Sequence, residues 1–294
     1  MIHVLFGWAG RAASRRYPGA ARPLRATALV LILAIAGGCI SEAREREIGD
    51  TMASEVNPHL PLIHDSLVTT YLESLGTRIS RVSARPNLEY RFYLVNTDAV
   101  NAFALPGGHV YVTRGLVERT ADGAEFAGVL AHEIGHVAAR HGVRKLQRQL
   151  RTGSLVNLLY RVFLGGEPAL LSDNALELAN TAWSARHSRR DEKEADRLAV
   201  RYLTLTGIDP EGVVSLLETV QRVEAAEERG PTGRMAVWLS SHPVTARRID
   251  EARAEIENVA TVQAAVPAPV LDAYHDFRIL VMSYAPDIIE YPRG

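Results

Sequence analysis

The sequence is poor in several features that would each point to a particular class of protein. It has one cysteine among 294 residues, so an intramolecular disulfide is excluded, and so is thiol catalysis at any position other than Cys39. Its formal net charge is −1, so no overall positive field recruits nucleic acid and we expect no nucleic-acid partner. No apolar run approaches the roughly 20 residues of a membrane-spanning helix, and no repeat of solenoid length is present.

The N-terminal region has the pattern of a secretory signal. Residues 1–25 contain several arginines and no acid, residues 26–36 are apolar, and Gly37-Gly38-Cys39 follows. A cysteine after small residues resembles the lipobox of bacterial lipoproteins. We therefore interpret residues 1–38 as a lipoprotein-type signal peptide and Cys39 as the acylated first residue of the mature chain. The alternative is a cleaved, soluble periplasmic protein in which Cys39 is incidental.

The remaining residues are typical of a globular protein. Hydrophobic residues make up 47% of the sequence and charged residues 23%, so about 250 residues can form one large domain with a substantial core. We divide them into a lipid tether and N-terminal helix (39–60), a central domain (61–260) and a C-terminal tail of unassigned role (261–294). Asp65 is predicted to cap an amphipathic helix whose apolar face includes Leu67, Val68, Tyr71, Leu72, Leu75 and Ile79.

A histidine-rich motif is the strongest chemical signal in the chain. His132, Glu133 and His136 form the pattern His-Glu-x-x-His inside a predicted helix of about residues 121–141. Histidines four apart lie on one helical face, so both rings can reach one metal ion. Glu133 projects beside that face, where it can hold a water on the metal. Because such a motif also arises by chance, it needs a third ligand before it identifies a metal site.

An acidic run downstream offers that third ligand. Glu192 and Asp196 are four apart in a predicted helix of about residues 174–206, so one of them can ligate the metal while the other orients a ligand histidine. Two histidines and a glutamate that leave a fourth position open for water are a common catalytic zinc set. The alternative for an isolated run of this kind is a solvated charged surface.

Three further segments carry candidate functional residues. Residues 90–96 alternate as a strand, and a turn joins a second extended segment, with Asn101, Phe103, Gly107 and Gly108, to a strand at 109–112. The strand at 109–112 can bind an extended peptide at the edge of the sheet, or it can belong to a plain hairpin inside the core. His109 can be a fourth metal ligand, but we expect a structural histidine. Residues 155–164 can be a lid, a lipid contact or a packed loop.

Near residue 240, the sequence Ser241-His242-Pro243 precedes a predicted helix that ends at about residue 258. His242 can swing toward the metal or simply cap the surface, and Arg248, about one turn into that helix, can brace an acidic ligand.

Taken together, these motifs resemble the gluzincin metallopeptidases of the HtpX and CAAX prenyl protease family, and within it the periplasmic, BepA-like branch. The matching segments cover roughly residues 42–260 in the family's order, and no tetratricopeptide pattern follows residue 260. They are 101–108, 132–136, 192–196, 241–243 and 248–249.

The resemblance implies one zinc ion per chain, held by His132, His136 and Glu192, with Glu133 as general base. It assigns Asp196 to the support of a ligand and places the His242 loop over the cleft. It also implies an α+β, mainly α, zincin-like fold with a small β-sheet beside the helix of the motif.

The expected activity is hydrolysis of peptide bonds in unfolded or extended envelope proteins, in the bacterial periplasm and at the outer membrane through lipid on Cys39. The rival interpretation is a latent, metal-stabilised chaperone or binding module. The presence of Glu133 argues against that rival, because a structural zinc site needs no base.

Overall fold

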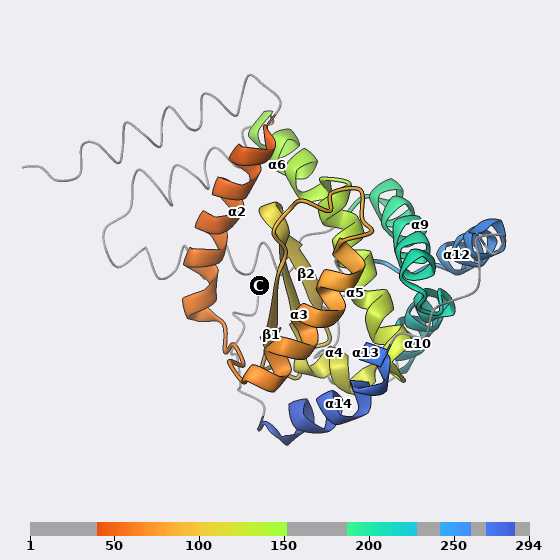
Figure 1. The fold of residues 1–294 in the computed structure, drawn as a ribbon. Helices are drawn as coiled ribbons and strands as arrows, with labels where there is room; N and C mark the ends of the chain where they lie inside the picture. The colour runs from red at the N-terminus through yellow and green to blue at the C-terminus, as the bar shows by residue number, and fades with distance from the viewer. Residues whose placement is uncertain (1–39, 152–186, 228–241, 260–268, 286–294) are drawn as a thin grey trace, which may run out of the picture.

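The computed structural model describes residues 40–151, 187–227, 242–259 and 269–285 (Figure 1). It confirms the predicted class: a mainly helical α+β fold with one small sheet. Within the described ranges, every helix falls short of the length and apolarity that a membrane-crossing segment requires. The elements in chain order are α2 (Glu42–Val56), η1 (Asn57–His59), α3 (Ser66–Ser80), β1 (Arg91–Val95), β2 (Ala102–Leu105), η2 (Pro106–Gly108), β3 (His109–Thr113), α4 (Arg114–Arg119), α5 (Gly123–Ala138), α6 (His141–Arg151), α9 (Arg189–Thr206), α10 (Glu211–Glu227), α12 (Ala246–Val259), α13 (Pro269–Asp272) and α14 (Tyr274–Ser283).

The sheet has three strands in the order β1-β3-β2, and it divides the core into two parts. β1 runs parallel to β3, whereas β2 is antiparallel to it. Because successive side chains of a strand point to opposite faces, Val110 and Val112 join the main core while Tyr111 joins a smaller cluster on the other face. Figure 1 shows α2 on one side of the strands and α3 and α5 on the other.

Helix α3 begins where the sequence predicts. The carboxylate of Asp65 accepts hydrogen bonds from the backbone N–H groups of Leu67 (2.7 Å) and Val68 (3.4 Å), which satisfies two of the free donors of the first turn. The predicted apolar face is confirmed for Val68, Tyr71, Leu72, Leu75 and Ile79, which are all buried. Leu67 was wrongly placed on that face: it is 70% exposed, because it lies in the first turn on the side away from the core.

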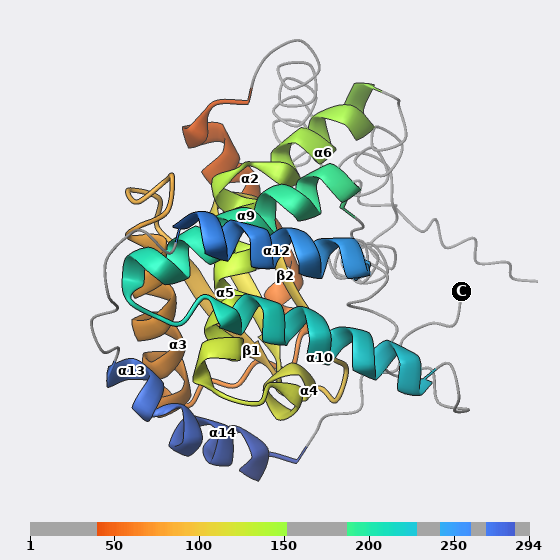
Figure 2. The same cartoon turned by 90° about the vertical axis from the view of Figure 1, so that its right-hand side faces the viewer.

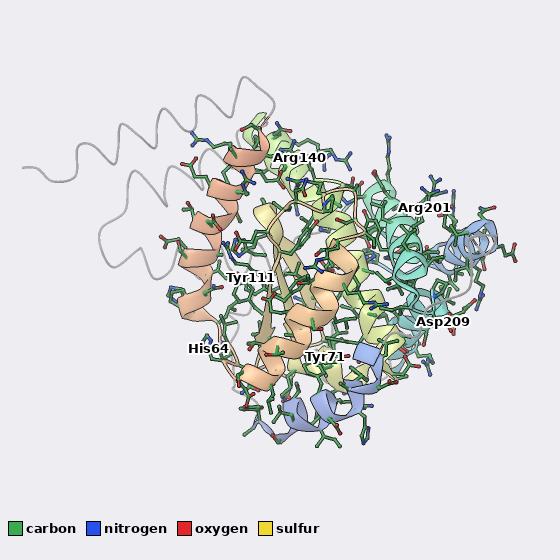
Figure 3. All side chains as sticks on the ribbon, viewed as in Figure 1. His64, Tyr71, Tyr111, Arg140, Arg201 and Asp209 are labelled. Atoms are coloured by element: carbon green, nitrogen blue, oxygen red, sulfur yellow. The ribbon has the colours of Figure 1, made fainter. Side chains whose placement is uncertain are left out.

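The predicted N-terminal helix is present as α2, but it packs onto the domain and does not extend away from it as a tether. A β-carbon at Gly49 would lie 1.8 Å from the Pro106 carbonyl oxygen, so only glycine permits this approach. Glu45 is buried and accepts hydrogen bonds at 2.8 Å from both Arg85 and Arg140. A buried carboxylate needs such cationic partners, and Figure 3 shows Arg140 where α2 and α6 meet.

Helices α9 and α10 pack against α5, and α12 packs on α9 and α10 from the outside (Figure 2). The predicted helix from about residue 174 to 206 begins instead at Arg189, and residues upstream of 187 lie outside the described part of the chain. The reason for this start is a capping box: the Ser188 side chain accepts from the Asp191 N–H, and the Asp191 side chain accepts from the Ser188 N–H. Gly207 ends the helix in the left-handed conformation, as its position predicts.

The segment after residue 260, to which the sequence assigned no role, includes a helix of the core. In α14, Tyr274, Phe277 and Val281 are buried against the main core. The ring of Phe277 stacks on Tyr71 of α3 with centroids 4.2 Å apart and lies 5.5 Å from Phe126 of α5. Figure 3 places Tyr71 on α3 next to this C-terminal helix. Helix α14 therefore packs on α3 and α5 and completes this part of the main core.

Candidate metal centre

The two histidines of the motif lie where α5 packs against α9. Helix α5 starts at its Asp122 cap and ends at Ala138, somewhat short of the predicted residue 141. His132, Glu133 and His136 are all buried on it. Between the histidines, Gly135 faces α9, where an added β-carbon would lie 3.1 Å from the Ala195 carbonyl oxygen. This small-residue contact lets Glu192 and Asp196 of α9 reach the histidines of α5.

Four side chains converge on one point. Nε2 of His132 and Nε2 of His136 are 3.0 Å apart, and the Glu192 carboxylate oxygens lie 3.6 Å and 3.4 Å from these two atoms. Nδ1 of His242 completes the group, 3.3 Å from His132 and 3.0 Å from Glu192. A tetrahedral zinc ion with bonds of about 2.0–2.1 Å separates its ligand atoms by about 3.3 Å. The donor types and their spacing therefore fit one zinc-like ion.

The other ring nitrogen of His132 is held by an acid. Nδ1 of His132 lies 2.9 Å from Oδ1 of Asp196, which is also buried. A carboxylate at Nδ1 keeps the proton on that nitrogen and leaves Nε2 free to bind a metal. The two acids four apart on α9 thus occupy different places, Glu192 at the cluster centre and Asp196 behind His132. The resemblance implies that Glu192 is a ligand and that Asp196 supports a neighbouring ligand, and these roles stay predictions.

Arg248 links α12 to both acids. It donates to Asp196 through Nε and Nη2, each at 2.8 Å, and its Nη1 lies 2.8 Å from Oε2 of Glu192. Burial alone would raise the pKa of Asp196, but Arg248 beside it, together with His132, holds the pKa below its usual value. Arg248 therefore keeps the carboxylate charged in a buried position.

Glu133 is as buried as Glu192 and Asp196 but, among the described residues, has no arginine beside it. It is buried, its Oε1 lies 3.6 Å from Nε2 of His242, and that oxygen accepts no hydrogen bond from the described residues. Burial raises the pKa of Glu133 to about 7, against the opposing effect of His132. A carboxylate with a pKa near neutrality can both accept and return a proton.

One histidine that sequence reasoning missed lies directly behind His136. His141 is fully buried, and its Nδ1 is 2.8 Å from Nδ1 of His136. His187, just before α9, also lies against this ring, with centroids 4.0 Å apart and the ring planes tilted by 40°. Burial lowers the pKa of His136 well below the usual value, so its ring is neutral and able to bind a metal. The only signal in the sequence was a third histidine five residues after the motif.

The residues of the predicted substrate edge are used mainly for packing. Asn101 and Phe103 are buried, and Phe103 stacks on Tyr111 at 4.6 Å between centroids. Gly107 and Gly108 do not line a free edge: added β-carbons would lie 3.1 Å from the α2 backbone and 2.6 Å from the Glu89 carbonyl oxygen. The two glycines therefore allow close backbone contacts, and the expectation that they face substrate is corrected.

His109 is a structural histidine, as expected. Its Nε2 lies 3.0 Å from Asp50 and its Nδ1 3.0 Å from the Tyr93 hydroxyl, away from the four converging side chains.

A narrow cleft connects strand β2 with the cluster. Ala104 of β2 is only half-buried, and the cleft passes from it toward Glu133 and His136 at its inner end. Its remaining walls come from α2, η2, α5 and α6 and include Glu45, Pro106, Val137, Arg140, Val143 and His187. The lining thus joins residues of β2 to two residues of the cluster, and the space between them, about 10 Å³, has the size of about one water molecule.

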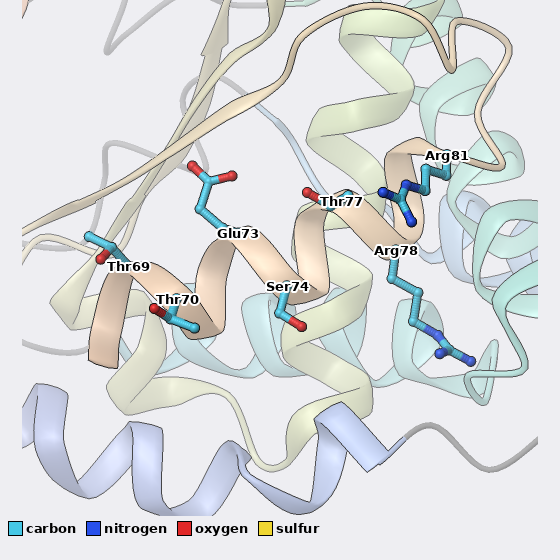
Figure 4. A pocket seen from close by; sticks show the side chains of 7 residues that line it. All are labelled: Thr69, Thr70, Glu73, Ser74, Thr77, Arg78 and Arg81. Atoms are coloured by element: carbon cyan, nitrogen blue, oxygen red, sulfur yellow. The ribbon is translucent and has the colours of Figure 1, made fainter. Parts of the chain in front are cut away.

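A second hollow, of about 650 Å³, lies on the outer side of α3 (Figure 4). Its lining has no histidine and one acid, and Arg78 at its margin already donates to the Thr206 carbonyl oxygen at 2.6 Å. It is separate from the candidate metal centre. The lining residues are Thr69, Thr70, Glu73, Ser74, Thr77, Arg78 and Arg81. Cys39 and the apolar segment 155–164 lie outside the described residues.

Two histidines of one helix and a glutamate of a second are ligand types of a metallopeptidase, and a second buried glutamate lies beside them. Comparison with known families agrees. Residues 66–256, more than half of the chain, match the model of peptidase family M48, and the chain belongs to that family. M48 metallopeptidases are metal-dependent.

The chain is similar to several named proteases. It is 32% identical to the beta-barrel assembly-enhancing protease of Yersinia pestis over 74% of this chain and 45% of the relative. It is 29% identical to the mitochondrial metalloendopeptidase OMA1 of Schizosaccharomyces pombe, over 81% and 64% of the two chains. Metalloprotease LoiP of Escherichia coli K12 is 27% identical over 73% and 81%. The chain spans about half the length of the assembly-enhancing proteases it matches.

Proposed function

We propose that this chain is a zinc-dependent endopeptidase in which His132, His136 and Glu192 hold the metal and Glu133 is the general base. The observation that carries the proposal is the convergence of these ligand atoms at 3.0–3.6 Å beside a buried carboxylate. Membership in peptidase family M48 supports the same reaction class. The proposal gives a chemical task to three of the four converging side chains, and to Glu133 beside them.

When bound, zinc polarises a scissile carbonyl and makes the attacking water more acidic. Glu133 accepts the proton of that water and passes it to the leaving amine. Asp196 keeps the His132 proton on Nδ1, so that Nε2 faces the cluster. Arg248 keeps both α9 acids charged and in place.

We further propose that the substrate is an extended or unfolded polypeptide. Such a chain can add to the sheet along β2, which pairs only with β3 among the described strands and opens into the cleft toward Glu133. The name of the Yersinia relative connects that protein with assembly of β-barrels. By analogy we propose misassembled envelope proteins as substrates, in the periplasm, with lipid on Cys39 holding the enzyme to the outer membrane.

The test compares the purified parent with Glu133→Gln in metal content and in hydrolysis of unfolded casein. The amide has nearly the same shape but cannot accept the proton, so the variant should keep one zinc per chain and lose at least about 100-fold in rate. Equal hydrolysis by the two proteins would refute the assignment of the base. A parent that binds zinc and casein but cleaves nothing, with His242→Ala equally inactive, would instead support a metal-stabilised binding module.

A further inference from the structure

The two histidines of the α5 motif are supported on their outer sides in different ways. Nδ1 of His132 meets a carboxylate directly, at Asp196. Nδ1 of His136 meets another imidazole, that of His141, at 2.8 Å. Nε2 of His141 lies in turn 3.3 Å from Oε2 of Glu194 and 3.6 Å from Oδ1 of Asp191. Helix α9 therefore supports both rings, one directly and one through His141.

The hydrogen-bond geometry fixes where the protons lie in this chain of contacts. If Nε2 of His136 faces the metal, its Nδ1 carries the proton and must donate. The acceptor at 2.8 Å is Nδ1 of His141, which must then carry its own proton on Nε2. That proton points at the carboxylates of Glu194 and Asp191, which can only accept. The N–H donors of both rings, Nδ1 of His136 and Nε2 of His141, thus each have an acceptor.

The local fold holds His141 in this position. After the C-cap of α5 at Ala139, Arg140 adopts a positive φ of 56°, and His141 then starts α6. The side chain of Arg140 is fixed at 2.8 Å to the buried Glu45 of α2. A residue other than glycine is costly in this conformation, so the turn is held by contacts, and it brings His141 back beneath His136.

The carboxylates beyond His141 are also held. Arg144, one turn along α6, lies 3.2 Å from Glu194 and 3.5 Å from Asp191. Asp191 additionally belongs to the capping box of α9. Removal of Glu194 alone therefore still leaves a carboxylate, that of Asp191, 3.6 Å from Nε2 of His141.

We propose that His141 is a positioning residue that fixes the tautomer and orientation of His136 and thereby raises the affinity of the metal centre. The inference rests on the ligand role of His136 in the proposed function. His141 does not touch the metal position or the substrate; its effect passes through the Nδ1–Nδ1 hydrogen bond. Groups behind a ligand histidine typically contribute 10–100-fold to metal affinity.

A second metal ion at the same histidines is the alternative. His136, His141 and His187 bring their nitrogens within 4.8 Å of one another. A metal there would need Nδ1 of His136 as a ligand, while Nε2 of the same ring serves the first cluster. The His136 ring would then have to lose both N–H protons and bridge two cations as a negatively charged imidazolate. Removing the second proton costs free energy, and the described neighbours of Nδ1 are mainly other histidines. The hydrogen-bonded arrangement needs no such step.

The experiment measures zinc affinity by competition with a chromophoric chelator in the full chain. His141→Leu removes the acceptor, whereas His141→Asn places its side-chain oxygen near the position of the histidine Nδ1. We expect about 10–100-fold weaker zinc binding in the leucine variant and recovery to within a few-fold of the parent in the asparagine variant. His109→Asn is the matched control, since it alters a buried histidine away from the cluster and should leave the affinity unchanged.

The outcomes separate this proposal from the proposed function. A parent that binds one zinc, with both His141 variants unchanged in affinity or equally weakened, would overturn the positioning role alone. Two zinc ions in the parent and one in His141→Leu would replace it with the second metal site. No zinc in the parent would overturn both. Circular dichroism of the metal-free variants, together with their thermal unfolding, establishes that the leucine variant is folded, and Co²⁺ absorption spectra report ligand geometry independently of activity.

Discussion

Arg248 and Asp196 form a two-point ion pair, with Nε to Oδ2 and Nη2 to Oδ1 both at 2.8 Å, although α12 and α9 are separated by dozens of residues in the chain. The same guanidinium lies 2.8 Å from Glu192 through Nη1, which also donates to the carbonyl oxygens of His242 (3.3 Å) and Pro243. One buried side chain thus connects a proposed ligand, the support of another ligand and the loop that carries His242.

Arg248→Lys tests this connection. A lysine keeps the charge but cannot make the planar two-point contact or reach all three groups. We expect zinc affinity to fall by about 10-fold or more, with hydrolysis falling when zinc is limiting. Arg247→Lys is the control, because Arg247 is 81% exposed and only pairs with Glu251 on the surface. Equal zinc affinity in Arg248→Lys and the parent would show that the contacts of Arg248 do not stabilise the metal centre.

The identity of the acidic ligand is tested by comparing Glu192→Ala with Glu194→Ala. Glu192 is buried at the cluster, whereas the Glu194 side chain is 43% exposed and contacts His141 and Arg144 on the outer side of the cluster. The first variant should lose most of its bound metal, and the second should still bind one zinc per chain, measured by atomic absorption after gel filtration. The opposite pattern would remove Glu192 from the ligand set.

The sequence predicted the parts of the centre that lie at fixed helical spacing. His132 and His136 share a face because residues four apart do, and the same rule placed Glu192 and Asp196 together. The strand at β1 and the cap at Asp65 were also predicted, because both depend on local patterns. The choice between Glu192 and Asp196 as ligand came from family resemblance and not from spacing.

Features that depend on tertiary contacts were not predicted. The turn at Arg140, which brings His141 behind His136, depends on the buried Glu45 of a distant helix. The docking of α2 depends on Gly49 opposite Pro106, which no periodic pattern reveals. Helix α14 was missed because its apolar residues follow a weakly patterned stretch, and its partners Tyr71 and Phe126 come from other helices.

The role of α14 in stability is tested by Phe277→Ala. This ring is buried between Tyr71 and Phe126, so its removal leaves a cavity and should lower the free energy of unfolding by about 3–5 kcal/mol. For a domain of this size that corresponds to a fall in Tm of about 10 °C, measured by calorimetry. Ile279→Ala on the same helix is the control, since Ile279 is 56% exposed. A variant as stable as the control would show that α14 is not part of the folded core.

Acylation of Cys39 can be checked directly in cells. Cys39 follows Gly37-Gly38 at the end of the predicted signal, where a lipoprotein would be cleaved. A fatty-acid probe should label the parent and not Cys39→Ser, and only the parent should sediment with membranes. An unlabelled parent in the soluble periplasmic fraction would support the plain secreted form.

The position of His242 fits two roles, a fourth metal ligand that blocks the site or a donor to the oxyanion of the reaction intermediate. Its Nδ1 lies among the ligand atoms, 3.0 Å from Glu192 and 3.3 Å from His132, at the place of a fourth ligand. Its other nitrogen faces Glu133 at 3.6 Å. A neutral imidazole is a good zinc ligand and would exclude the water that hydrolysis requires. The alternative is that His242, moved slightly outward, stabilises the oxyanion of the reaction intermediate.

The two roles predict opposite changes in His242→Ala. We favour the closed arrangement, in which substrate or a partner must displace His242 before hydrolysis begins, and in that case basal casein hydrolysis should rise. An oxyanion donor would instead give a loss of about 100–1,000-fold in kcat. The exposed His64→Ala serves as control. Because Arg248 holds the carbonyl oxygens of His242 and Pro243, Arg248→Lys should shift basal activity in the same direction as His242→Ala once zinc is saturating. Unchanged hydrolysis and zinc affinity in His242→Ala would eliminate both roles.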